Sequence, residues 1–212
     1  MKSKLFLSIL ILVSSNVLSQ SFCEEIKSVV TDSTSQYFYP LLLEKVKNNP
    51  EKIDEADCYY LYYGQVFQSN FRPLGSIGYQ ERMDLEIAMR NESYNKVIRL
   101  GKILLERNPV DLTSLLYTAM CIDKKKKYID NEYIAQRYSN LLSAIFFTGD
   151  GKTKETAIKI VCMEDDYVLK GVLGLLGGKE QLMFDNNKSY SVWVKNDKKI
   201  YFEDVYCKKQ YE

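Results

Sequence analysis

The sequence predicts an α+β protein in which a helical half, residues 20–148, precedes a small antiparallel β-sheet with one helix, residues 149–212. Apolar residues recur at spacings of three and four as far as about Phe147, which is typical of amphipathic helices. After Gly149-Asp150-Gly151 the period changes, and short alternating stretches separated by Asn- and Lys-rich turns follow. A chain of 212 residues can form one domain, or two small ones that share a core.

The first 19 residues have the pattern of a secretory signal. Lys2 and Lys4 precede a mostly apolar run over residues 5–13, and Val17 and Ser19 suit a cut before Gln20. The run is far shorter than the roughly 20 residues that a membrane-spanning helix needs. We therefore expect a signal peptide at 1–19 and a soluble protein in the periplasm or outside the cell, with no membrane span after cleavage. An uncleaved anchor is the alternative.

Two helices are predicted in the first part of the helical half. The stripe Tyr39, Leu42, Leu43 and Val46 defines one helix, which Asn49-Pro50 ends because proline disfavours helical conformation in its predecessor. Asp54 or Asp57 is placed to cap the next helix, which carries an aromatic-rich segment over residues 59–67.

Further helices fill the rest of this half. The clearest stripe is Tyr94, Val97, Ile98, Gly101, Leu104 and Leu105, and Asn108-Pro109 ends that helix. Asp111 is placed to cap the following helix, and a last one spans about residues 134–145.

The second half reads as strand, helix and three strands. Residues 157–163 are apolar and β-branched, and residues 167–176 form a helical stretch that Gly177-Gly178 closes. Residues 181–184, 190–195 and 199–205 are predicted as strands of an antiparallel sheet, joined by polar turns.

Two resemblances add to this interpretation. The block from Tyr94 to Pro109, with Asp111 and Leu115, resembles the second helix and link of a tetratricopeptide repeat, a helix pair that buries its stripe by stacking on the next pair. The landmarks Tyr39-Pro40, Leu61-Tyr62-Tyr63-Gly64, Gly149-Asp150-Gly151-Lys152 and Tyr201-Phe202 resemble an uncharacterised family of secreted Bacteroidetes proteins, classed as a domain of unknown function. That resemblance implies export and a helical half before a small sheet. It does not imply any particular reaction.

Composition excludes several function classes. Histidine is absent, which removes Ser-His-Asp and Cys-His mechanisms and His-ligated metal sites. A net charge of +1 gives no broad basic field for nucleic acid. The sequence Gly149–Thr153 lacks the first glycine of a phosphate loop, since Phe146 occupies that position. We expect no cofactor and no metal.

The five cysteines leave their pairing open. Cys23, Cys58, Cys121, Cys162 and Cys207 are widely spaced and form no Cys-x-x-Cys pair. Up to two disulfides are possible in an exported protein, but the favoured interpretation is that most are buried free thiols.

The tyrosine-rich helix is the candidate binding surface. Tyrosine joins a stiff apolar ring to a polar tip, which suits peptide or sugar recognition. We therefore predict that Tyr62, Tyr63, Phe67 and Gln68 line an aromatic groove. The alternative is a core helix whose hydroxyls bond to neighbouring backbone.

The expected function is non-catalytic: an exported interaction module that holds a protein or peptide partner in a helical groove. A hydrolase using carboxylates is one alternative, because glycoside cleavage can run on two acids, and Glu81, Glu164, Asp165 and Asp166 are available. A saccharide-binding protein is the other.

Overall fold

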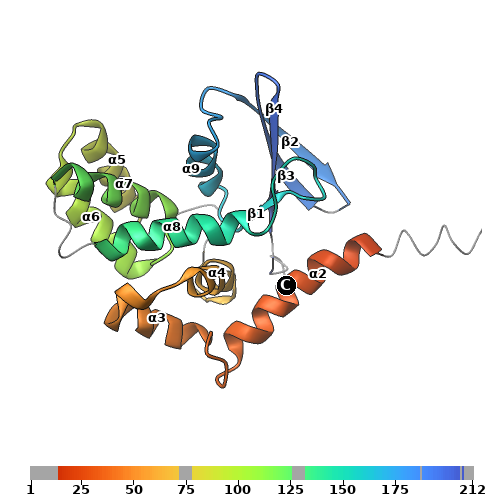
Figure 1. Cartoon of the computed structure of the whole chain (residues 1–212), viewed down its shortest axis with the longest axis horizontal. Coiled ribbons are helices and arrows are strands. Elements are labelled where there is room, and N and C mark those ends of the chain that lie inside the picture. Colours follow the sequence, from red (N-terminus) through yellow and green to blue (C-terminus); the bar gives the residue numbers. More distant parts are fainter. Residues whose placement is uncertain (1–13, 72–77, 126–131, 187, 206, 208–212) are drawn as a thin grey trace, which may run out of the picture.

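A computed structural model describes residues 14–71, 78–125, 132–186, 188–205 and 207 (Figure 1). Helices occupy the first part of the chain, and four strands with one helix occupy the last part, as the sequence predicts. Most of the predicted signal peptide lies outside the described residues, and its last part belongs to a helix that spans Ser14–Thr31. In the described part of the chain, no helix combines the length and apolarity needed to cross a membrane.

The N-terminal helices are α2 (Ser14–Thr31), α3 (Tyr39–Asn48) and α4 (Glu55–Gly64), with short 3-10 turns η1 (Pro50–Lys52) and η2 (Gln65–Phe67). The predicted cap of α4 is confirmed and uses both aspartates. Asp54 accepts a hydrogen bond from the Asp57 backbone N–H at 2.8 Å, and Asp57 accepts one from the Asp54 N–H at 3.0 Å. This capping box fixes where the tyrosine-rich helix begins.

The next four helices pack against one another in chain order (Figure 1). They are α5 (Tyr79–Arg90), α6 (Tyr94–Arg107), α7 (Leu112–Lys125) and α8 (Glu132–Phe146), and α8 also packs on α4. The predicted stripe of α6 is buried from Val97 to Leu105. Asp111 caps α7 by accepting a 2.7 Å hydrogen bond from the Ser114 N–H, as its position predicts.

The C-terminal part contains β1 (Ile158–Ile160), α9 (Asp165–Val172), β2 (Lys179–Asp185), β3 (Lys188–Lys195) and β4 (Lys198–Asp204). The strand order is β1-β4-β3-β2, and β2, β3 and β4 form an antiparallel meander. The expectation of a wholly antiparallel sheet is wrong for β1, which pairs with β4 in parallel. The sheet is mixed because the chain leaves β1 through α9 and two further strands before β4 returns beside it.

One apolar core joins the two parts. Buried residues from α2, α4, α7, α8 and the sheet belong to the same cluster; examples are Ile26, Leu61, Leu115, Leu141 and Phe202. α9 lies beside the sheet on the side that faces α7 (Figure 1). The helical half and the sheet therefore hold a fixed relation, and residues from both can form one site.

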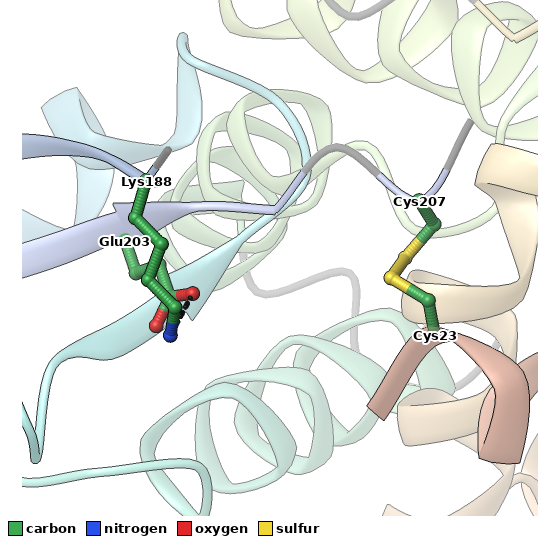
Figure 2. Close-up of a disulfide and its surroundings, with 4 residues drawn as sticks. All are labelled: Cys23, Lys188, Glu203 and Cys207. Carbon is green, nitrogen blue, oxygen red and sulfur yellow. Dashed lines mark ion pairs between the residues drawn. A yellow bond between two sulfur atoms is a disulfide. The ribbon is translucent and has the colours of Figure 1, made fainter. Parts of the chain in front are cut away.

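Two further links involve the C-terminal strands (Figure 2). A disulfide joins Cys23 of α2 to Cys207, which follows β4 and lies 184 residues further along the chain. Lys188 Nζ of β3 lies 2.8 Å from Glu203 Oε1 of β4, where the glutamate side chain is almost fully buried. The other three cysteines are free, as expected for the majority, but only Cys58 and Cys121 are buried and Cys162 is partly exposed, so buried free thiols are two of the five.

Candidate functional site

A cavity of about 330 Å³ lies where the helical half meets the segment between β1 and α9. Its wall combines apolar and polar side chains from α3, η2, α5, α6, the link before α7, and the start of α9. They are Tyr39, Leu43, Gln65, Gln68, Ser69, Asn70, Phe71, Arg82, Leu104, Arg107, Asn108, Pro109, Val110, Asp111, Thr113, Cys162, Glu164 and Asp165. We call this the junction cavity.

A buried ion pair forms one side of the junction cavity. Arg82 of α5 donates from Nη2 to Asp111 Oδ2, and both side chains are about nine-tenths buried. Asp111 is also the cap of α7, so one carboxylate orients the guanidinium and begins a helix. Arg82 Nε is buried and has no hydrogen-bond partner among the described residues.

Asp165 is a buried carboxyl group that lines the same cavity. It is 7% exposed, and Tyr62 donates a hydrogen bond from its hydroxyl to Asp165 Oδ2 at 2.7 Å. Burial raises the pKa of Asp165 to about 8, and Asp111 and Glu164 act in the same direction against the Tyr62 hydrogen bond and Arg82. At neutral pH this side chain is therefore mostly a neutral acid, which can donate as well as accept a hydrogen bond.

Side-chain amides supply most of the remaining polarity. Gln65 donates from Nε2 to the Tyr62 carbonyl at 2.9 Å, and Asn108 donates from Nδ2 to Gln65 Oε1 at 3.3 Å. Asn108 Oδ1 in turn accepts from the Val110 N–H at 3.2 Å. This chain of bonds fixes the orientation of both amides in the wall, and Gln68 and Asn70 add two more amides after η2.

Cys162 lines the same cavity but is poorly suited to act as a nucleophile. Burial, followed by the nearby Asp165 carboxyl, raises the pKa of its thiol well above the usual value. The thiolate is the reactive form of cysteine, and a raised pKa disfavours it. No histidine exists in the chain to activate the thiol.

The structure does not bring together the four residues predicted to line an aromatic groove. Tyr62 and Tyr63 are 0% exposed, so neither presents its ring at the surface. The Tyr63 hydroxyl donates to the Lys159 carbonyl at 2.9 Å, as the core-helix alternative requires, and Tyr62 supports Asp165 from behind the cavity wall. Phe67 is partly buried and packs on the core, and only Gln68 lines the junction cavity.

The four carboxylates considered for a hydrolase do not lie in one site either. Glu164 and Asp165 line the cavity, whereas Asp166 accepts hydrogen bonds from Trp193 Nε1 and Ser191 Oγ beneath the sheet. Glu81 is ion-paired with Arg107 at 2.8 Å, and it is Arg107 that reaches the cavity wall.

Sequence reasoning missed Arg82, Gln65 and Asn108 as site residues. Asp111 was expected only as a cap, and Arg82 lies 29 residues before it, a separation that carries no local signal. Only the packing of α5 against the α6–α7 pair brings the two together.

No metal site emerges from the residues that the structure covers. No group of three or more His, Cys, Asp or Glu residues within the described ranges is arranged to hold an ion.

Comparisons with known proteins place the chain in a family but give it no activity. No curated protein and no solved structure matches it significantly. One family model, described as a domain of unknown function (DUF4919), matches residues 24–210. That match covers both the helical half and the sheet, including every residue of the junction cavity, and the chain therefore belongs to this family of unknown function.

Proposed function

We propose that this protein is a non-catalytic binding module that holds an extended peptide segment of a partner protein in the junction cavity. The observation that carries the proposal is the wall itself, which joins oriented amides to apolar surface and a neutral carboxyl group. Peptide backbone presents one donor and one acceptor per residue, and amide side chains can satisfy both. The volume of about 330 Å³ is near the lower limit of ligand pockets, which suits a short segment.

The absence of an activated nucleophile in the described site supports binding over catalysis. The Cys162 thiol is held protonated by burial, and Asp111 is occupied by Arg82 and the start of α7. The groups that face the cavity are thus arranged to exchange hydrogen bonds. The packing of consecutive helices in the helical half is in keeping with this role, because stacked helix pairs commonly present binding surfaces.

We further propose that the protein is exported. The N-terminal pattern of basic and apolar residues is one support. The other is the Cys23–Cys207 disulfide, because disulfides persist in oxidising compartments and are rare in the cytosol.

A peptide-library selection on the purified protein, followed by a Gln68→Ala substitution, tests the binding proposal. We expect the selected peptide to bind about 3- to 10-fold more weakly to this variant, since a neutral hydrogen bond contributes about 0.5–1.5 kcal/mol. Gln136→Ala is the matched control, because Gln136 is exposed on α8 and pairs only with Asn140 in the described structure. Equal affinity of the Gln68 variant and the wild type would contradict the proposal.

A carboxylate hydrolase is the second candidate, and one observation favours it. Asp165, a neutral acid at pH 7, shares the cavity with Asp111, which is ion-paired with Arg82. Carboxyl groups with separated protonation states are the usual acid and base of glycoside cleavage. Turnover of a glycoside panel that is abolished by Asp165→Asn, with peptide binding absent, would favour this candidate over the binding module.

A further inference from the structure

A second cavity, of about 580 Å³, lies between α3, α6 and α8. Helical spacing presents side chains of all three helices to it: Val46 and Lys47 from α3, Lys102 and Leu105 from α6, and Tyr133 and Arg137 from α8. We call this the basic cavity. It adjoins the junction cavity, because Leu43, Arg107 and Pro109 line both.

The unusual feature of the basic cavity is Arg137. The residue is only 4% exposed, and its Nε is buried without a hydrogen-bond partner among the described residues. None of the ion pairs between described residues includes it. The Arg137 carbonyl accepts a contact from Cys58 Sγ at 3.8 Å, which involves the backbone and not the guanidinium.

A buried cation without a counter-ion is costly. Leaving a buried charge unpaired destabilises a protein, and arginine does not lose its proton in proteins. Burial lowers the pKa of Arg137, and the nearby Cys58 and Tyr133 act in the opposite direction. An anion that enters the cavity would remove this cost, and the free energy recovered would favour its binding.

The surrounding charges favour an anion as well. Lys47, Lys102 and Arg107 join Arg137 in the wall, and among the described residues that line it Glu106 is the only acidic one. Arg107 is already ion-paired with Glu81, whereas no ion pair within the described structure includes Lys47 or Lys102. A guanidinium fork flanked by ammonium groups matches the geometry of carboxylate and phosphate oxygens.

We propose that the basic cavity is a binding site for a small oxyanion ligand bearing a carboxylate or phosphate group, with Arg137 as its central contact. The inference does not depend on the peptide-binding role of the junction cavity. Lys47 and Lys102 supply the outer contacts, and Tyr133 and Leu105 form apolar wall for the body of the ligand.

Thermal unfolding at constant ionic strength tests the site, with sodium phosphate and sodium succinate each compared with sodium chloride. We expect a saturable rise of Tm in at least one oxyanion, because a ligand that binds only the folded state stabilises it. A response to phosphate alone assigns a phosphate ligand, a response to succinate alone assigns a carboxylate, and a response to both assigns oxyanions in general.

Substitution of Arg137 distinguishes a site from a general salt effect. Arg137→Met should weaken the apparent Kd about tenfold or more, as expected for loss of a charged hydrogen-bond donor. Arg99→Met is the matched control, since Arg99 is exposed on α6 and outside the cavity. A double variant, Lys47→Gln with Lys102→Gln, should weaken binding about 3- to 10-fold and keeps the test valid if the Arg137 variant does not fold.

The proposal fails if neither oxyanion raises the wild-type Tm above that in chloride. It also fails if Arg137→Met, or the double lysine variant where the former does not fold, retains the wild-type Kd by equilibrium dialysis with labelled phosphate or succinate.

Discussion

Asp165 combines near-complete burial with a position in the wall of the junction cavity. Its hydrogen bond from Tyr62 ties the start of α9 to α4, and the Tyr62 hydroxyl also accepts from the Val161 N–H at 3.3 Å. Tyr62, which the sequence predicts as a surface contact, is therefore a buried hydrogen-bond donor to Asp165. A change in the protonation of Asp165 acts on both the cavity and the packing of α4.

The stability of the protein should fall as the pH rises from 6 to 8. Asp165 has a folded-state pKa of about 8 against 3.8 as the ordinary value, so the folded state keeps a proton that the unfolded state has lost. Stability is greatest below the lower pKa and declines up to the higher one, by at most about 1.4 kcal/mol per pH unit for one proton. Chemical denaturation at several pH values measures this slope.

Asp165→Asn should flatten the slope between pH 6 and 8. Asp204 has its pKa raised to about 6, chiefly by burial, so most of its own contribution is lost by pH 7. Asp204→Asn is therefore a control that alters the slope below pH 7 and leaves it unchanged between pH 7 and 8. An Asp165 variant with the wild-type slope would show that another group titrates there.

At the scale of elements, α6 packs tightly against α7 at Gly101. A Cβ added there would lie 1.9 Å from Thr118 Oγ1 and 3.2 Å from Thr118 Cβ, both on α7. The sequence places Gly101 in the apolar stripe of α6 but does not reveal that its missing side chain sets the distance between two helices.

Gly101→Ala should destabilise the protein by about 1–3 kcal/mol, because the two helices must separate to make room. Gly171→Ala is the matched comparison in α9, where the nearest atom to an added Cβ is Leu176 Cδ1 at an ordinary 3.9 Å. That substitution should stabilise by up to about 1 kcal/mol, through helix propensity. Urea unfolding of both variants measures the difference, and equal effects of the same sign would contradict the packing argument.

Helix boundaries were predictable where a local group determines them. Asp54 and Asp111 begin α4 and α7 because their carboxylates pair with backbone N–H groups three residues on, a short-range relation that sequence displays. The parallel pairing of β1 with β4 was not predictable in this way. It joins Ile158 to Phe202 across a large stretch of chain, and alternation in a strand does not specify its partner.

At the scale of the whole molecule, both cavities are assembled from segments that are distant in sequence. The sequence predicts Gln68 as a binding residue, and it lines the junction cavity. No pattern in the sequence indicates that Arg82 and Arg137 line cavities. An arginine in a helix usually lies on the solvated face, and only the packing of neighbouring helices shows that these two are buried.

The Cys23–Cys207 disulfide should contribute about 2–5 kcal/mol to the free energy of unfolding, because it closes a very long loop in the unfolded chain. Reduction should lower Tm, and Cys23→Ser combined with Cys207→Ser should do the same without reductant. Adding reductant to the double variant should leave its Tm unchanged. A further fall would mean that another disulfide forms in solution.

The pairing of β1 with β4 has a consequence for biogenesis. During synthesis the sheet cannot be completed until β4 has been translated, because β1 pairs with β4 and β4 follows α9, β2 and β3 in the chain. The Cys23–Cys207 disulfide also cannot form before then, because Cys207 follows β4. Ribosome-stalled intermediates that stop before Ile200 should therefore leave Ile158 and Ile160 without their neighbouring strand and remain sensitive to protease.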